Sequence, residues 1–381
     1  MTPDTIAVLL DTLRLRGGAE AASLRERWAQ VPTKGLRALA EYEGVALWLH
    51  RRLQEIGAAP SASFREKLRR AAMRSGADNA RIDAQALAVL TRLESAGFRC
   101  LLIKGQARRA AVARYPYADA RPLSDVDLLV PEPEADAAWT LLCETGFRRV
   151  YEEPVDWTAD HHRPTIIDDS EVSVELHTTT GDSVSADEAW RRATTAADEV
   201  DWQGRRRLVP NATELLWQAL SHAVSDGTRG FRLRTFHSMA VVLASDETID
   251  WTEMSKRLAS GEIRAADRRS TARAEHVREI LGVAAWLAGV SLPHAFAPRS
   301  RPDVARLLLW RARVLSSKRS ESVRDRLLDE SLRVEAHLPL TPATPGYGVW
   351  RGLRRRGASV VARAVYLAWR AGAPHAKSRS G

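Results

Sequence analysis

The sequence has few cysteines and no long hydrophobic run. Its only two cysteines, Cys100 and Cys143, suit a reducing cytoplasm and form no pair with metal-ligand spacing. No apolar stretch approaches the roughly 20 residues that a transmembrane helix needs. Residues 1–18 place an acid before their apolar part and have no basic leader, unlike a signal peptide. We therefore expect a soluble cytoplasmic protein.

Positive charge, in contrast, is in excess. The chain has 57 basic and 48 acidic residues, which give a formal net charge of +9. Such an excess favours an anionic partner, such as a nucleotide, a nucleic acid or a membrane surface. Most of the basic residues are arginine, which a GC-rich genome also produces, so composition alone does not favour nucleic acid. The hydrophobic fraction of 45% predicts an ordinary globular protein with more than one core.

The first part of the chain has the apolar spacing of helices. Apolar residues recur at helical intervals from Leu36 to Leu53 and again near 64–72 and 84–93. Gly97 follows the last of these stretches and is a typical helix stop. These patterns predict a helical region over residues 1–96.

The middle of the chain alternates between short apolar runs and helical patterns. The runs at 98–103 and 124–131, and the alternating polar and apolar residues at 171–178, are typical of strands. The segments 106–115 and 133–147 between them are typical of helices. A strand–helix–strand–helix–strand order predicts a small α/β core.

From Thr213 onward the helical pattern returns. It predicts helices over 214–224 and 232–245, a long basic helix ending near Val290, and two more over 303–317 and 321–336. We find no internal repeat.

These patterns together predict an α+β protein, in which a small mixed-sheet core is embedded between N-terminal and C-terminal helical regions. The predicted parts are an N-terminal helical region at 1–96, the α/β core at 97–210, a C-terminal helical domain at 211–338, and a linker with a basic helix or tail at 339–381.

Two aspartates of the central strand suggest a metal site. Asp125 and Asp127 alternate along the strand, so both carboxylates point to one face. On the last strand, Glu175 shares its face with Ser173 and His177. If these strands are neighbours, three carboxylates converge, and like charges are costly to bury together. Mg²⁺ prefers oxygen ligands and removes that conflict. Two such ions steady both the attacking and the leaving oxygen in phosphoryl transfer.

Residues near these carboxylates are suited to bind phosphate. Gly105 lets the backbone come close to a phosphate, and Lys104, Arg121 and Ser124 supply charge and hydrogen bonds to a triphosphate. Phosphoryl transfer needs this combination of positioning and charge neutralisation. Taken singly, Lys104 is equally consistent with a solvated lysine, and Arg121 with a surface ion pair.

The stretches LLIKG, RPLSDVDLLV and VSVELH resemble the polymerase-beta-like nucleotidyltransferase superfamily. They resemble most closely its bacterial branch of uncharacterised nucleotidyltransferases, over roughly residues 20–250. The resemblance implies that Asp125 and Asp127 are metal ligands and that Glu175 is the third carboxylate, a ligand or a base toward the acceptor. The residues that match the pattern of this branch are Lys104, Gly105, Arg121, Asp125, Asp127, Glu175, Leu176, His177 and His222.

The chain departs from the family pattern at three points. Gln106 stands where the wider superfamily has a serine, which places more weight on Lys104 and Arg121. The segment from Gly105 to Asp125 is longer than in compact members. His237 stands where an aspartate is expected.

The resemblance implies a metal-dependent nucleotidyltransferase of the EC 2.7.7 type. It would use two Mg²⁺ or Mn²⁺ ions to move a nucleoside monophosphate from a nucleoside triphosphate, with ATP expected, to a hydroxyl or phosphate of an acceptor. A small molecule or a peptide natural product is the favoured acceptor, and nucleic acid is not favoured. The alternatives are a non-catalytic nucleotide- or partner-binding module on the same fold, and an RNA-directed, toxin-like nucleotidyltransferase.

Several other residues have two interpretations. His177 either contacts phosphate, acceptor or a carboxylate, or is a structural histidine. His222 is best interpreted as a core histidine. His161 and His162 have no further zinc ligands at suitable spacing, and Asp168 with Asp169 indicates a turn.

The C-terminal stretch is strongly basic. Between Arg351 and Arg379 it has eight Lys or Arg and no acid, together with a helix-compatible apolar patch. This pattern is consistent with a helix that contacts an anionic membrane surface or RNA. The favoured interpretation is a terminal helix packed on the body of the protein.

Overall fold

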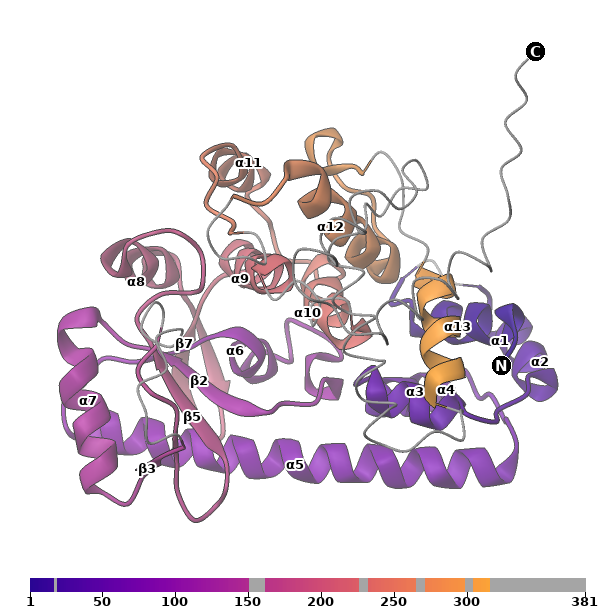
Figure 1. Ribbon diagram of the computed structural model, residues 1–381, viewed down its shortest axis with the longest axis horizontal. Coiled ribbons are helices and arrows are strands. Elements are labelled where there is room, and N and C mark those ends of the chain that lie inside the picture. The colour runs from indigo at the N-terminus through magenta and orange to yellow at the C-terminus, as the bar shows by residue number, and fades with distance from the viewer. Residues whose placement is uncertain (17–18, 151–161, 226–231, 265–270, 299–303, 316–381) are drawn as a thin grey trace, which may run out of the picture.

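The structure is a computed structural model, and it describes residues 1–16, 19–150, 162–225, 232–264, 271–298 and 304–315. Helices dominate, and a small mixed sheet lies toward one end of the molecule (Figure 1). Within the described residues, no helix has both the length and the apolar character that crossing a membrane requires. The predicted α+β class, with a small mixed sheet between helical regions, is confirmed.

The N-terminal region is helical, as predicted. Four short helices group at the end of the molecule opposite the sheet (Figure 1). A fifth, much longer helix connects them to the sheet. The five are α1 (Pro3–Leu13), α2 (Ala21–Gln30), α3 (Leu36–Tyr42), α4 (Ala46–Glu55) and α5 (Ala62–Ser95).

Helix α5 joins two stretches that the sequence pattern suggested separately. Its 34 residues run without interruption through Gly76, giving a length of about 50 Å. A glycine inside a helix costs about 1 kcal/mol relative to alanine but does not end it. Gly97, with a φ of 83°, follows the helix and confirms the predicted stop.

The main sheet has five strands in the order β1-β2-β5-β4-β3. The central pair, β2 and β5, is parallel, and every other neighbouring pair is antiparallel. The three strands predicted from apolar runs are present, but the first is shorter than expected. The strands are β1 (Leu101–Leu102), β2 (Asp125–Leu129), β3 (Arg148–Arg149), β4 (Ile166–Ile167) and β5 (Ser173–His177).

Two helices and a short 3₁₀ turn separate the first strands. Helix α6 (Lys104–Ala110) begins directly at Lys104, two residues earlier than the pattern indicated. The turn η1 (Ala118–Ala120) follows it. Helix α7 (Glu132–Glu144) follows β2 and ends before Gly146, whose φ is 110°.

A hairpin that the sequence analysis did not assign follows helix α8 (Ala186–Thr195). Its strands are β6 (Asp198–Trp202) and β7 (Arg205–Val209), joined by Gln203 and Gly204. Both linking residues have positive φ, of 54° and 69°, as a two-residue hairpin turn requires.

Most of the C-terminal helices lie on the side of α6 that faces away from α5 (Figure 1). The described residues contain five of them, four of which fall in regions predicted to be helical. They are α9 (Ala212–Ser225), α10 (Leu233–Leu243), α11 (Trp251–Ala259), α12 (Ala274–Ala288) and α13 (Val304–Leu315), with the short 3₁₀ turn η3 (His294–Phe296) after α12.

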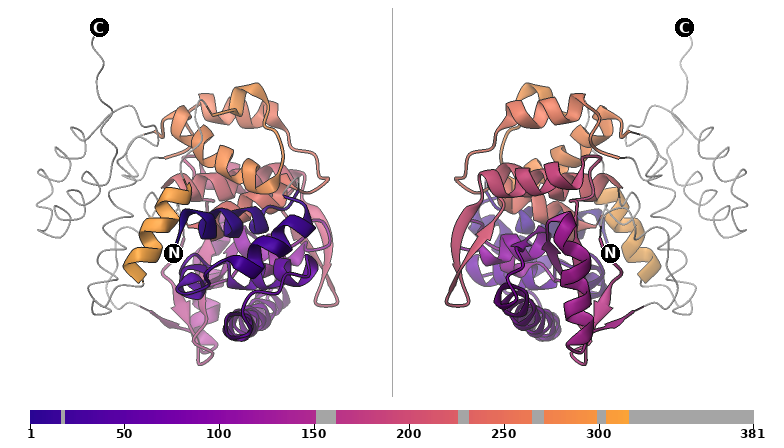
Figure 2. Two further views of the ribbon diagram at one scale, coloured as in Figure 1. Left: turned by 90° about the vertical axis from the view of Figure 1, so that its right-hand side faces the viewer. Right: turned by 90° about the vertical axis from the view of Figure 1, so that its left-hand side faces the viewer.

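Helix α13 leaves its neighbours in sequence and packs on α1 and α3 (Figure 1 and Figure 2). The side chains of Arg311 and Glu43 are fully buried there, with 2.8 Å between Nη1 and Oε1. One hydrophobic cluster extends from α1 through the sheet to α13. The boundaries at 96/97 and 210/211 therefore stay predictions, and the predicted helix at 321–336 and tail at 339–381 lie outside the described residues.

Candidate metal centre

The parallel pairing of β2 and β5 places acidic residues of distant segments side by side. Asp127 lies opposite Glu175, and Asp125 lies opposite Ser173. Alternation along each strand puts Asp125 and Asp127 on one face of β2, and Glu175 and His177 on one face of β5. The neighbouring strands on which the sequence argument depended are therefore present.

Asp127, Glu175 and His177 form the centre of the cluster. One potential ligand atom from each lies within 4.8 Å of the others. Nε2 of His177 is 2.8 Å from Oδ1 of Asp127 and 3.3 Å from Oε2 of Glu175. Two carboxylates and an imidazole at this spacing could hold a divalent metal ion, for which the carboxylate oxygens are the ligands that Mg²⁺ or Mn²⁺ would prefer.

Asp125 lies beside this cluster rather than within it. Ser124, at the exposed start of β2, donates its hydroxyl to Oδ1 of Asp125 at 3.0 Å. Burial, followed by the negative charge of Asp127, raises the pKa of Asp125 to about 6. Within the described part of the chain, Asp125 has no cationic partner as close as Lys104 is to Asp127. A divalent ion would relieve the repulsion between the two aspartates.

Lys104 occupies the position of a counter-ion at the cluster. Its ammonium donates to Oδ1 of Asp127 at 2.7 Å and lies 3.1 Å from Nε2 of His177. The residue has a φ of 53°, unusual for a side chain other than glycine. Its backbone N–H donates to Oε1 of Gln218 at 3.3 Å, so α9 helps to hold this strained turn.

The charges shift the cluster toward its ionised forms. Burial alone would raise the pKa of Asp127, but Lys104 and His177 more than offset it, and the pKa is lowered. For Glu175, burial is likewise offset, chiefly by the contact with His177, and the pKa falls to about 2. Burial opposes the charge of Lys104, yet the carboxylates raise its pKa. Asp127, Glu175 and Lys104 thus stabilise one another in their ionised forms.

Gly105 makes room for Arg121. A Cβ at Gly105 would lie 2.7 Å from Nη1 of Arg121 and 2.9 Å from Cδ2 of Leu123. The guanidinium therefore packs directly over the turn that carries Lys104. Among the described residues its one hydrogen bond is a long one, 3.5 Å, to the carbonyl of Pro122.

Asn79 of α5 holds the loop that carries Arg121. Its buried amide donates to the Arg121 carbonyl at 2.9 Å and accepts from the Leu123 N–H at 2.8 Å. It also donates to the Asp119 carbonyl at 3.3 Å. The loop before β2 is thereby fixed to the long helix.

Sequence analysis missed His162 as a neighbour of the site. Its ring lies edge-on to that of His177, with 5.1 Å between centroids, and its Nε2 is 3.9 Å from Glu175. The hydroxyl of Thr165 donates to Glu175 at 3.3 Å. Residues 151–161, among them His161, lie outside the described residues. No spacing rule would have found His162, because an isolated bridge to His177 places it there.

Two other histidines, His222 and His237, differ in burial. His222 is exposed on α9, so its interpretation as a core histidine is wrong. His237, at the position where an aspartate was expected, is almost fully buried. Asp168 accepts from the backbone N–H and hydroxyl of Ser170, at 2.9 and 2.5 Å, which confirms the predicted turn.

The fold and the site together define an α+β protein with an acidic cluster across two parallel strands. Residues 31–278 match the family described as uncharacterised nucleotidyltransferase. The match covers most of the chain, so the protein belongs to this family. Comparison with curated proteins and with solved structures found no match.

Proposed function

We propose that the protein transfers a nucleoside monophosphate from a nucleoside triphosphate to an acceptor and releases pyrophosphate. An acceptor oxygen, from a hydroxyl or a phosphate, forms a bond to the α-phosphorus. The bond from that phosphorus to the bridging oxygen of the β-phosphate breaks, and the acceptor proton passes to a base. Family membership and the register of β2 against β5 support this proposal.

In this proposal the acidic residues hold the metal. Asp125, Asp127 and Glu175 would hold the Mg²⁺ or Mn²⁺ ions, which would neutralise the phosphates and lower the pKa of the attacking group. Glu175 also accepts the acceptor proton when a hydroxyl attacks. His177 orients Asp127 and Glu175 through its contacts of 2.8 and 3.3 Å.

The donor phosphates lie over the turn at Lys104 and Gly105. Lys104, whose ammonium lies 2.7 Å from Oδ1 of Asp127, supplies positive charge to these phosphates. Arg121, packed over Gly105, and Ser124, at the exposed start of β2, supply the remaining donors. The helical regions form the acceptor pocket, and the favoured acceptor is a small molecule or a peptide.

The observation that carries the proposal is the direct pairing of Asp127 with Glu175. A structural role would favour one buried carboxylate matched with one cation. Two carboxylates opposite each other, with a third two residues away, are instead a costly arrangement unless an ion is bound there.

The test is turnover of each triphosphate with Mg²⁺ or Mn²⁺ in the presence of candidate acceptors. Pyrophosphate release and a mass increase of the acceptor by one nucleotide are expected. The variant Asp125→Asn with Asp127→Asn should lose both signals. Equal turnover by this variant would refute the proposal, whereas nucleotide binding without release across all acceptors would support the non-catalytic alternative.

A further inference from the structure

Arg108 is the exception among the buried arginines of the described residues. Three others, Arg207, Arg257 and Arg311, each form an ion pair with a glutamate. Arg108 is 4% exposed and forms none; its one hydrogen bond there is a 3.5 Å contact to the Leu215 carbonyl. A buried guanidinium without an anion is costly, so an anionic ligand would be stabilised at this position.

Buried polar atoms without partners lie on the helices that pack next to α6, which carries Arg108. Among the described residues, no hydrogen bond is made by Nε2 of Gln218, Oγ of Ser221 or either ring nitrogen of His237, and all are buried. Nε of Arg121 is in the same state. Native proteins leave few buried polar atoms unsatisfied. We call Arg108, Arg121, Gln218, Ser221 and His237 the α6–α9–α10 cluster.

The α6–α9–α10 cluster adjoins the candidate metal centre. Arg108 follows Lys104 by one turn of α6, and such residues share a helix face. Gln218 contacts the backbone of Lys104 through its other amide atom. The charges of Arg108 and Arg121 both act on His237, and that of Asp127 acts on Arg108. The cluster therefore continues from Lys104 and Arg121 toward the C-terminal helices.

We propose that the α6–α9–α10 cluster binds the terminal phosphates of the donor's polyphosphate chain. Arg108 and Arg121 supply charge, and Ser221, Gln218 and His237 supply hydrogen bonds. The inference rests on the proposed function, because it assigns a binding position to the group that leaves as pyrophosphate. The ligand should carry several negative charges in a row, because Lys104, Arg121 and Arg108 follow one another from the candidate metal centre into the cluster.

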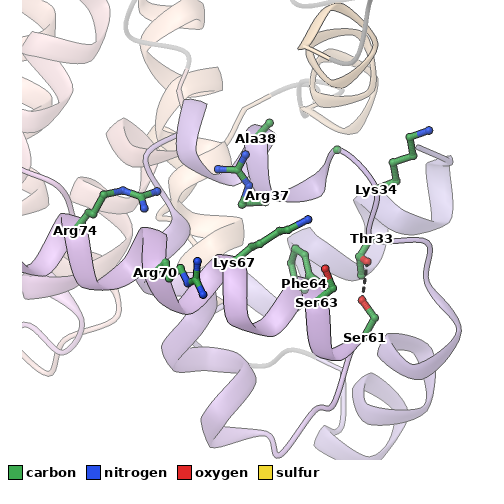
Figure 3. A pocket seen from close by; sticks show the side chains of 11 residues that line it. Thr33, Lys34, Arg37, Ala38, Ser61, Ser63, Phe64, Lys67, Arg70 and Arg74 are labelled. Atoms are coloured by element: carbon green, nitrogen blue, oxygen red, sulfur yellow. Dashed lines mark hydrogen bonds between the residues drawn. The ribbon is translucent and has the colours of Figure 1, made fainter.

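A second cationic feature provides the control. A surface pocket of about 540 Å³ is lined by Lys34, Arg37, Lys67, Arg70 and Arg74 (Figure 3). Its basic side chains are largely exposed, and three of them already pair with Glu41 or Glu66. Exposed lysines and arginines attract any polyanion weakly, so charge-neutralising variants here measure non-specific binding.

The experiment is titration of the full chain with inorganic triphosphate in EDTA, by calorimetry and thermal unfolding. Wild type should bind and be stabilised. In Arg108→Met the ligand-free protein should unfold at a higher temperature, because a buried unpaired charge is removed, while affinity falls by about tenfold or more. Ser221→Ala, a smaller change, should lower the affinity by about threefold. Lys67→Gln with Arg70→Gln should bind as wild type does.

The nucleotide arm identifies the phosphates. ATP affinity should fall in Arg108→Met while AMP affinity stays the same; equal ATP affinity, or an equal loss for AMP, would overturn the assignment. A lower unfolding temperature for ligand-free Arg108→Met would make Arg108 a structural residue and also overturn it. Asp127→Asn should retain triphosphate binding. If the wild-type protein bound triphosphate through Arg108 but transferred no nucleotide, only the proposed function would be refuted.

Discussion

Glu43 and Asp127 are both buried carboxylates, but their surroundings differ. In the helical part, Glu43 accepts from Arg311 at 2.8 Å and from the Leu233 N–H at 2.9 Å, so both of its oxygens are satisfied. At the sheet, Asp127 shares one lysine with Glu175 and Asp125. Matched charges connect helices, whereas the carboxylates at the sheet share one lysine and Arg108 nearby has no ion pair, as the proposed binding of metal and phosphate would require.

The largest expected effect is a loss of nucleotide transfer when a carboxylate of the candidate metal centre is neutralised. Glu175→Gln keeps the shape of the side chain but removes the charge that the proposed metal and acceptor require. We expect nucleotide transfer to fall by about 10²–10³-fold, with the free energy of unfolding changed by less than about 1 kcal/mol. Pyrophosphate release and chemical denaturation measure the two. Glu171→Gln, an exposed acid before the same strand, is the control and should keep full activity.

At the buried Glu43–Arg311 pair, we expect a loss of stability. Glu43→Gln leaves Arg311 without its counter-ion in a fully buried position. Removing one partner of such a pair costs about 3–5 kcal/mol of the free energy of unfolding. The double variant Glu43→Met with Arg311→Met should recover most of the loss. A single variant as stable as wild type in a urea titration would show that the pair does not hold α13.

The buried ring of His237 makes the stability of the protein depend on pH. Burial, with the charges of Arg121 and Arg108 adding to it, lowers the pKa of His237 to about 3. The unfolded chain then binds a proton below about pH 6.5 that the folded chain refuses. Stability is therefore lost as pH falls through that value, by about 2 kcal/mol at pH 5.

His237→Leu should remove this acid sensitivity. Urea titrations at pH 7 and pH 5 would show a smaller difference for the variant than for wild type. A substitution of the exposed His294 should leave the difference unchanged. An identical pH response of wild type and His237→Leu would contradict the buried, neutral state of this ring.

The smallest expected effect is at Gly105. A Cβ there presses on the ends of two side chains, Arg121 and Leu123, which are able to move aside. Gly105→Ala should therefore cost less than about 1 kcal/mol of stability. It should lower kcat/KM by about tenfold, because Arg121 moves from its position over the turn. An unchanged kcat/KM would show that this position of Arg121 is not used.

The site was predictable where the signal was local. Alternation put Asp125 and Asp127 on one face, and the apolar runs on both sides identified β2 and β5 as buried strands. Their pairing was a condition of the predicted metal site, since no local pattern states which strands are neighbours. The assignments of catalytic, nucleotide-binding and metal residues stay predictions.

Other parts depended on tertiary contacts. Strands β3 and β4 have two residues each, too few for any periodicity to show. Gln218 reaches Lys104 across 114 positions of sequence, and His162 reaches the site through a single bridge. The apolar pattern showed two separate helical stretches, near 64–72 and 84–93, but α5 continues through the residues between them.

The uninterrupted course of α5 has a consequence for how the chain tolerates insertions. One end of the helix packs with α3 and α4, and Asn79 near its middle ties down the loop before β2. One residue added between them would rotate Asn79 by about 100° relative to the N-terminal helices. A surface loop would absorb the same addition. Helix α5 thus sets the orientation of the N-terminal helices relative to the loop before β2. We therefore expect insertions into α5 between these two contacts to be tolerated only as whole helical turns.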